Sequence, residues 1–355
     1  MIFATLFGSA TSLGLGALQI NEGLDVLFGV GGRDAVGLAI LVIAVLTLCF
    51  VVSAVSGVHR GIQWLSNTNM ILAVFLIFFL FVLGPTVFIL DTFVQSLGGY
   101  LANLIPMSFR TASYGDSAFV SGWTIFYWAW WISWAPFVGT FIARFFRGRT
   151  IREFVVGIIL VPSVVSFVWF AVLGGAAINL QLSGTANISE AVAESQPAAL
   201  FSTLGAFPLS GLTSLIAIIL VALFFISGAD AASVVMGMLS SKGSLHPRAW
   251  NVIVWGVFTG AAAICLLAGA IQGSVGAAIT ALQSVAIASA APFVLIMIGL
   301  CFSVLKALRA ERVPDRAPEA AAPPEPGRPT SRPSGAGAPQ RMSLENTQER
   351  DQRRV

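Results

Sequence analysis

The chain has 355 residues, of which 57% are hydrophobic and 10% are charged, and its formal net charge is +3. A soluble domain does not carry this much apolar surface, so the composition excludes an ordinary globular protein, and the small positive charge does not indicate a nucleic-acid partner. Crossing a hydrocarbon core of about 30 Å takes roughly 20 apolar residues in a helix, so each long uncharged run predicts one membrane span.

Runs of this kind predict an all-α membrane protein with eight transmembrane helices. The first run begins almost at Met1, but no positive residue precedes it and it is rich in Ser, Thr and Gly. We therefore interpret it as a structural helix rather than a signal peptide. The predicted spans cover residues 2–20, 36–57, 68–90, 122–144, 152–178, 210–238, 250–271 and 277–306.

The segments between and after the spans differ in character. Apolar residues at helical spacing over 91–105 predict an amphipathic helix on the membrane surface, whereas the polar segment 179–209 predicts a loop with a short helix. Beyond Val313, prolines stand among Ala, Gly, Arg and Glu, a composition that cannot bury enough apolar surface to fold. The sequence therefore predicts a transmembrane domain over 1–308 and a disordered, Pro-rich cytoplasmic tail over 309–355.

Positive residues predict the orientation, because Lys and Arg near span ends are retained in the cytoplasm. They follow the even-numbered spans, most densely after the fourth, at Arg144, Arg147, Arg149 and Arg152. We therefore expect a multi-pass protein of the cell inner membrane with both termini in the cytoplasm. Arg144 and Arg149 are interpreted as topology signals, with a cytoplasmic gate or contact with anionic membrane lipid as the alternative.

Glycine is concentrated in the first span, where residues 8–16 read Gly-Ser-Ala-Thr-Ser-Leu-Gly-Leu-Gly. Small residues allow membrane helices to approach each other closely. Glycine also permits a helix to unwind and present carbonyls to a bound ion, and Thr11 and Ser12 would add hydroxyl groups to such a site. Both interpretations remain open for this run.

The fourth span contains five Trp within residues 123–134, more than anchoring at the membrane surfaces requires. Helical spacing puts Trp130 and Trp134 on one face, with Trp131 beside Trp134. Indole faces attract a methylated ammonium, which cannot donate hydrogen bonds, by about 0.5 to 2 kcal/mol for each desolvated contact. We interpret these three residues as a substrate box, with Tyr127 as a further contact; the alternative is helix packing and anchoring.

Asp230 is an ionisable residue of the sixth span. A carboxylate in a membrane span is costly and marks an ion path, a gate or an internal ion pair. Because Asp230 lies near the cytoplasmic end, three readings stay open: a gate or pair with an arginine of the 144–152 loop, direct contact with ion or substrate, and a hydrated helix end.

A family resemblance rests on these residues. The segment from Trp123 to Phe154 resembles the signature of the betaine/choline/carnitine transporter family, and further similarity lies at residues 10–20 and in Ser227-Gly228-Ala229-Asp230. The resemblance implies a leucine-transporter-type fold of twelve spans with an inverted repeat of five helices, of which the eight here match the fifth to the twelfth. It also implies a homotrimer and secondary transport of a small quaternary-ammonium solute such as glycine betaine, choline or carnitine.

The resemblance also implies roles for single residues. It places substrate contacts on Trp130, Trp131 and Trp134. Sodium-coupled members have Thr then Ser before the Ala-Asp pair, where this chain has Ser227 then Gly228, one hydroxyl fewer. Sodium and the proton are therefore the candidate coupling ions, and antiport without a coupling ion stays open as the alternative. The candidates for an ion or gate role are Phe137, Ser227, Asp230, Thr11 and Ser12.

Other functions remain open. In the family, a Gly-rich third span and an aromatic-bearing fourth span line the same site, and neither has a counterpart among the eight predicted spans. The alternative to a transporter is therefore a truncated, non-transporting membrane remnant or an oligomer partner. An integral-membrane enzyme is disfavoured, because no span shows paired His, a nucleophile with a base, or clustered carboxylates, and no metal or cofactor is expected.

Overall fold

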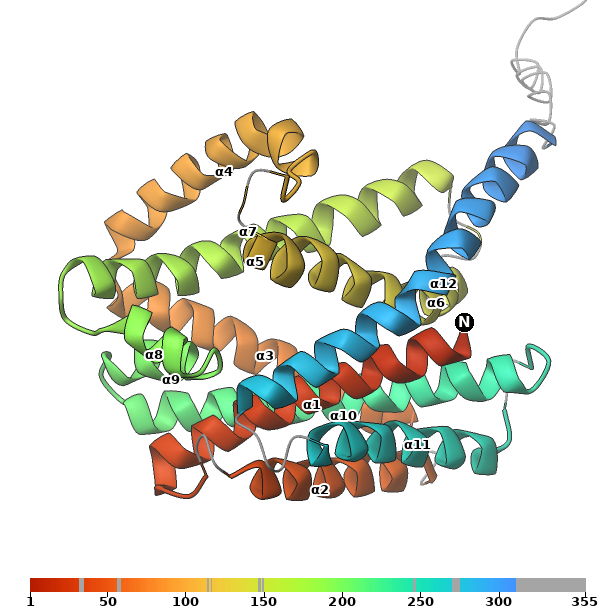
Figure 1. Cartoon of the computed structure of the whole chain (residues 1–355), viewed down its shortest axis with the longest axis horizontal. Coiled ribbons are helices and arrows are strands. Elements are labelled where there is room, and N and C mark those ends of the chain that lie inside the picture. Colours follow the sequence, from red (N-terminus) through yellow and green to blue (C-terminus); the bar gives the residue numbers. More distant parts are fainter. Residues whose placement is uncertain are drawn as a thin grey trace, which may run out of the picture. The chain divides into compact units, whose positions relative to one another are not determined.

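The computed structural model describes residues 1–31, 35–55, 59–113, 115, 117–145, 148, 150–244, 247–269 and 275–310, without the side chains of 54–55, 59–62, 144–145 and 275. These residues form helices and contain no β-strand. In chain order the elements are α1 Ile2–Phe28, α2 Val36–Val55, α3 His59–Leu83, α4 Thr86–Ser108, α5 Ser117–Phe119, a π-helix Val120–Ile125, α6 Phe126–Phe145, α7 Ile151–Leu182, α8 Ile188–Glu194, α9 Ala198–Gly205, α10 Ser210–Ser240, α11 Ala249–Ala268 and α12 Val275–Ala310 (Figure 1).

Eight helices in the described part of the chain are long and apolar enough to cross a membrane: α1, α2, α3, α4, α7, α10, α11 and α12. The prediction of an all-α membrane protein is therefore confirmed. The membership of the set differs from the prediction in one place. The predicted fourth span is formed by the π-helix and α6, which do not belong to the eight, whereas α4, predicted as a surface helix, does. Four Trp, Tyr127 and Pro136 make α6 aromatic rather than strongly hydropathic.

By its internal contacts the chain divides into two compact units, residues 1–302 and residues 303–355. Of the predicted tail, only Arg309 and Ala310 are described, and both belong to α12. The rest of that prediction lies outside the described residues.

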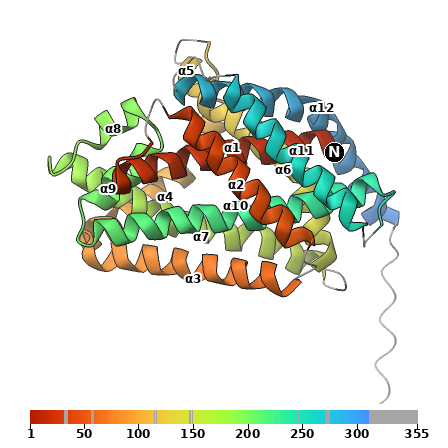
Figure 2. The same ribbon diagram turned by 90° about the horizontal axis from the view of Figure 1, so that it is seen from below.

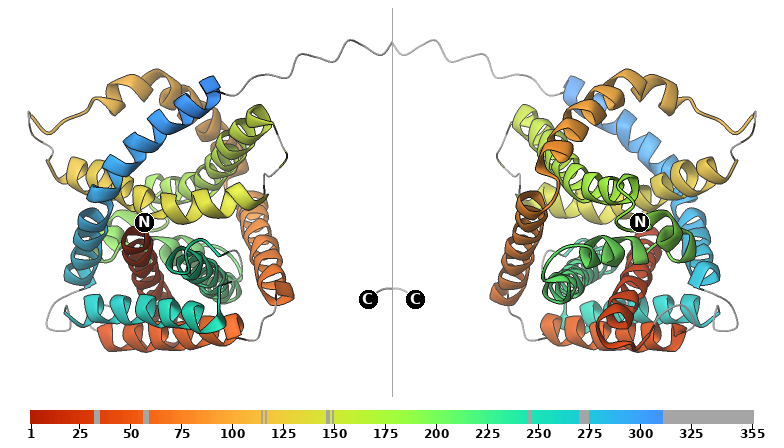
Figure 3. Two further views of the ribbon diagram at one scale, coloured as in Figure 1. Left: turned by 90° about the vertical axis from the view of Figure 1, so that its right-hand side faces the viewer. Right: turned by 90° about the vertical axis from the view of Figure 1, so that its left-hand side faces the viewer.

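The first helix is the centre of the larger unit. In its most apolar stretch 67% of the residues are buried, against 33% or less in each of the other seven helices. It packs against α2, α6, α9, α10 and α11 (Figure 2). Figure 3 shows α1 and α10 side by side, with α2 and α11 forming a layer across them. A residue on α1 is therefore placed to contact several helices at once.

Glycines explain how the helices come so close. A Cβ atom on Gly16 of α1 would overlap the ring of Phe225 on α10, and one on Gly260 of α11 would overlap the side chain of Thr47 on α2. Each glycine thus allows a contact that a larger residue would block. In this structure α1 is helical throughout residues 8–16, so the run serves close packing and is not unwound.

The predicted span 68–90 is broken into two helices. α3 ends at Leu83, and α4 begins at Thr86 after Pro85. Proline has no N–H to donate and disfavours the helical conformation in the residue before it. The Thr86 hydroxyl donates instead to the Phe81 carbonyl, at 2.7 Å. The Gly84-Pro85 pair therefore separates the two helices.

Two other predicted segments, the first span and the segment 179–209, differ from the structure. α1 continues to Phe28, eight residues past its predicted end, and stops at Gly29, whose left-handed φ of 65° is typical of a helix C-terminus. The segment 179–209 is not mainly a loop, because α7 extends to Leu182 and is followed by α8 and α9. Phe201 and Leu204 of α9 are buried in the core, so this segment is part of the packed bundle.

Candidate functional site

The aromatic residues of α6 form a continuous stripe facing the bundle. Phe126, Trp130, Trp134 and Phe137 recur at spacings of three and four residues, so they share one face of the helix. The rings of Phe126 and Trp130 are stacked, with centroids 5.8 Å apart and planes 8° apart. Trp134 meets Phe137 edge to face, with centroids 5.4 Å apart. The π-helix directly before this stripe is a local irregularity of a kind often found at functional sites.

Both inward tryptophans are fixed to the same serine of α1. The indole Nε1 of Trp130 donates to Ser12 Oγ at 2.9 Å, and that of Trp134 donates to the same oxygen at 3.1 Å. Ser12 Oγ in turn donates to the Gly8 carbonyl at 3.0 Å. The two rings are half-buried, while Ser12 is 4% exposed. The structure therefore turns Trp130 and Trp134 inward, onto the central helix, with part of each ring uncovered.

Gly8 lets the two helices meet at this point. A Cβ atom at Gly8 would overlap Ser133 Oγ, and Ser133 is fully buried in the interface. The Ser133 hydroxyl donates to the Trp130 carbonyl at 2.6 Å, so its polarity is satisfied within α6. This close contact brings Ser12, one turn further along α1, within reach of the two indoles.

The other two predicted substrate contacts lie further out. Trp131 is 61% exposed, and its nearest aromatic contact is Tyr127, with centroids 6.4 Å apart. Tyr127 also lies edge to face with Trp130, at 6.1 Å. Tyr127 thus contacts both Trp130 and Trp131, whereas Trp134 is connected to Trp130 through their shared hydrogen-bond acceptor, Ser12. Trp131 lies at the outer edge of this group.

Phe137 connects α6 to α10. It is 7% exposed and belongs to a buried cluster with Ala232, Val235 and Met236, against which Trp134 also packs. Trp134 comes near Gly228, where an added Cβ would lie 3.9 Å from the indole. The aromatic stripe of α6 is therefore held between α1 and α10.

The predicted ion or gate residues do not form one group. Thr11, although next to Ser12, points to α12, where its hydroxyl donates to the Leu282 carbonyl at 3.1 Å. Ser227 donates to the Phe224 carbonyl of its own helix at 3.0 Å. In the part of the chain that the structure describes, no cluster of three or more His, Cys, Asp and Glu side chains comes together.

Asp230 lies inside the bundle. Its side chain is 1% exposed and accepts a hydrogen bond from the Ser53 hydroxyl of α2, at 3.1 Å. The hydrated helix end considered for this residue is therefore wrong. Of the predicted arginine partners, Arg152 is exposed at the start of α7, whereas Arg147, Arg149 and the side chain of Arg144 lie outside the described residues.

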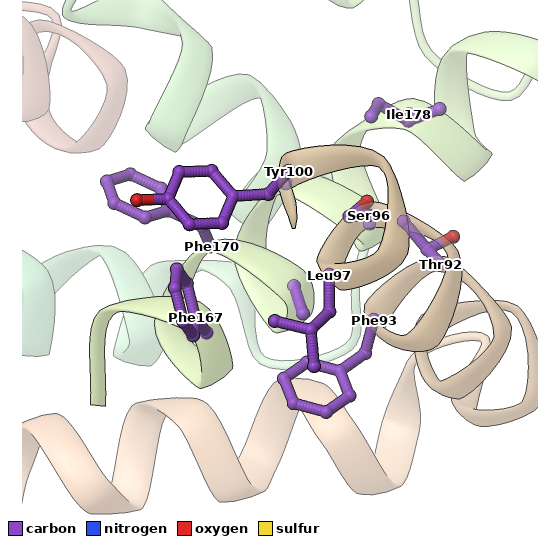
Figure 4. Close-up of a pocket in the computed structure, with 11 residues that line it drawn as sticks. Thr92, Phe93, Ser96, Leu97, Tyr100, Phe167, Phe170 and Ile178 are labelled. Atoms are coloured by element: carbon purple, nitrogen blue, oxygen red, sulfur yellow. The ribbon is translucent and has the colours of Figure 1, made fainter. Parts of the chain in front are cut away.

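A separate cavity of about 240 Å³ opens between α4 and α7 (Figure 4). Its wall is mainly aromatic and aliphatic, and includes Phe93, Leu97, Tyr100, Phe167 and Phe170. Tyr100 and Phe167 are in ring contact, with centroids 5.5 Å apart. None of the predicted site residues lines this cavity.

Sequence reasoning missed three contributors to the aromatic site. Phe126 stacks on Trp130. Its position four residues before that tryptophan predicts that the two side chains share one face of the helix. Gly8 and Ser133 form the close contact between α1 and α6, but they lie 125 positions apart in the sequence (133 minus 8), and no local pattern connects them.

The helices and the aromatic site together define a multi-pass α-helical membrane protein with a Trp-bearing helix packed on its central helix. Residues 1–313 match the betaine/carnitine/choline family of transporters (BCCT), and the chain belongs to that family. This is a family of transporters and not of enzymes.

Named relatives agree with this membership. The chain is 44% identical over 313 residues to the glycine betaine transporter OpuD of Bacillus subtilis, covering 88% of this chain and 59% of the relative. It is 46% identical over 311 residues to a probable glycine betaine transporter of Desulfitobacterium hafniense, covering 87% and 61%. It is 41% identical over 308 residues to an ectoine/hydroxyectoine transporter of Virgibacillus pantothenticus, covering 86% and 60%. The chain thus spans about three-fifths of the length of these relatives.

Proposed function

We propose that the protein is a secondary active transporter of small quaternary-ammonium solutes, with glycine betaine as the first candidate and choline and carnitine as the others. The observation that carries the proposal is the inward orientation of Trp130 and Trp134, whose N–H groups bind Ser12 while their ring surfaces remain partly uncovered. Tyr127 and Trp131 are the further proposed contacts. The names of the relatives support betaine as the substrate.

The physical basis is attraction between a cation and the faces of aromatic rings. A trimethylammonium group has no N–H to donate, so hydrogen-bond acceptors cannot hold it, whereas the negative face of an indole can. Each contact contributes about 0.5 to 2 kcal/mol, so a few rings bind such a solute firmly enough to select it and weakly enough to release it. Transport would then follow from rocking one group of helices against another around this site.

The coupling ion in this proposal is sodium or the proton. Ser227 and Thr11 have hydroxyl oxygens that are able to bind a hard cation, but Gly228 has no side-chain oxygen, and such cations need several oxygen ligands. Asp230 is the ionisable candidate for a gate or for proton coupling, being buried in α10. Uptake measured with a sodium gradient alone and with a proton gradient alone distinguishes the two ions.

The membrane setting completes the proposal. The chain is a multi-pass membrane protein, and we place it in the cell inner membrane with both termini in the cytoplasm, on the strength of the cations that follow the even-numbered predicted spans. We further propose the homotrimer that family membership implies. The mass of the detergent-solubilised protein, measured by light scattering, tests the trimer.

Uptake of labelled glycine betaine, choline and carnitine by cells expressing the chain tests the function. We expect saturable uptake above that of vector-only cells. No uptake above that level, with the chain present in the membrane fraction, would favour the non-transporting alternative.

The site itself is tested by replacing one ring at a time. Trp130→Leu and Trp134→Leu should each weaken the apparent affinity by roughly 2- to 30-fold, which corresponds to losing one cation–π contact. Trp128→Leu is the matched control, because Trp128 lies on the same helix and is 63% exposed. Unchanged uptake in the two site variants would show that the substrate binds elsewhere.

A further inference from the structure

Ser12 uses its whole hydrogen-bonding capacity on the aromatic site. A serine hydroxyl has one proton to donate and two lone pairs to accept with. Here the proton goes to the Gly8 carbonyl, and the two lone pairs receive the N–H groups of Trp130 and Trp134. In this arrangement the oxygen has no lone pair left for a cation. Ser12 therefore has a different part in the site from the ion ligand that the sequence pattern suggested.

The geometry of the two helices makes this contact specific. Trp130 and Trp134 are one turn apart on α6, so their Nε1 atoms come to the same side, and one buried oxygen on α1 lies between them at 2.9 and 3.1 Å. Because each side chain is also anchored to α6, fixing the direction of the indole N–H bond restricts the orientation of the ring plane. One hydroxyl thus sets the orientation of two rings on another helix.

We propose that Ser12 is a positioning residue for the substrate site, and that it determines how the site selects its ligand. By occupying both indole N–H groups, Ser12 leaves only ring faces to meet the substrate. The site then recognises the charge and girth of a methylated ammonium head, and makes no hydrogen bond through these rings to a carboxylate or hydroxyl elsewhere on the solute. This inference rests on the proposed function.

The contact is tested by Ser12→Ala and Ser12→Thr, read out in two independent ways. In purified protein, ultraviolet resonance Raman spectra report the hydrogen bonding of indole N–H groups. Ser12→Ala should shift that signal, and Ser12→Thr, which keeps the hydroxyl, should restore it. In transport, Ser12→Ala should raise the apparent KM by roughly 2- to 30-fold for each ring released, with a smaller effect on the maximal rate.

Ser240→Ala is the matched control. Ser240 Oγ accepts from the indole of Trp255 at 2.9 Å and donates to the Gly237 carbonyl at 3.0 Å. This repeats the Ser12 arrangement with a single ring, one that packs against the Phe137 cluster but is not a proposed substrate contact. This variant should shift the Raman signal and leave KM unchanged. An equal rise of KM in Ser240→Ala and Ser12→Ala would overturn the proposal, because any lost Trp–Ser bond would then have the same effect.

A second variant covers the case in which Ser12→Ala does not fold. Replacing Trp130 by benzothienylalanine keeps the size and face of the ring and removes only its N–H, so it should raise KM as Ser12→Ala does. An unchanged KM would contradict the proposal.

Selectivity is tested with 3,3-dimethylbutan-1-ol, the uncharged carbon isostere of choline, which should not compete for uptake. If the unmodified chain transports nothing, the proposed function fails, while the Raman comparison still tests the role of Ser12.

Discussion

At the scale of single residues, the sequence predicted that Trp130 and Trp134 share one face of α6, but it did not predict that Ser12 of α1 binds them. The i, i+4 spacing of Trp130 and Trp134 is a local pattern that any α-helix turns into a shared face. Ser12 lies 118 positions from Trp130, and only the packing of α1 on α6 brings the two together. Helical spacing alone did not predict the position of Trp131. It follows Trp130 directly on α6, yet it is 61% exposed.

Asp230 provides a prediction at this scale. Asp230→Leu should lower the stability by about 1 to 3 kcal/mol, because the Ser53 hydroxyl loses a buried acceptor, whereas Asp230→Asn keeps an acceptor oxygen and should cost less. Thermal unfolding in detergent measures both. Asp91→Leu removes an exposed carboxylate from α4 and should change the melting temperature little. Equal melting temperatures for Asp230→Leu and the unmodified protein would contradict a structural role for this contact.

At the scale of helices, the presence of each long helix was easier to predict than the residues at which it begins and ends. A long apolar run predicts a helix because every backbone N–H and C=O in hydrocarbon needs a partner within the same segment. The ends depend on single residues that stop a helix, such as Pro85 after α3 and Gly29 after α1. The burial of α9 could not be predicted, since it depends on which helices surround it.

The contact between α1 and α6 gives a prediction for a helix pair. Gly8→Ala should destabilise the protein by roughly 1 to 3 kcal/mol, because the added methyl group overlaps the Ser133 side chain in a packed interface. It should also raise the apparent KM for substrate, since α6 must move away from Ser12. The measurements are thermal unfolding and uptake.

Gly139→Ala is the control for that variant. Gly139 lies on α6 with open space where its Cβ would be, so alanine should be neutral or stabilise the helix by up to about 1 kcal/mol. Identical behaviour of the two alanine variants would mean that the helices do not meet closely at Gly8.

At the scale of the whole molecule, the proposed orientation can be tested with single cysteines. Ser189→Cys, in exposed α8, should react with a membrane-impermeant maleimide in intact cells. Lys242→Cys, in the turn after α10, should react only after the membrane is opened, because the cations near it are expected in the cytoplasm. The background is a chain whose Cys49, Cys265 and Cys301 have been replaced by Ala. The reverse labelling pattern would place the termini outside.

The central position of α1 has a consequence for biogenesis. α1 leaves the ribosome well before α6, α10 and α11, the helices that later cover it. Its mean hydropathy is 1.3, against 2.9 for α2, and it carries Thr5, Ser9, Thr11, Ser12 and Asn21 among its buried residues. We therefore expect a newly made α1 to stay beside the translocon or an insertase, out of contact with lipid, until these helices have been made.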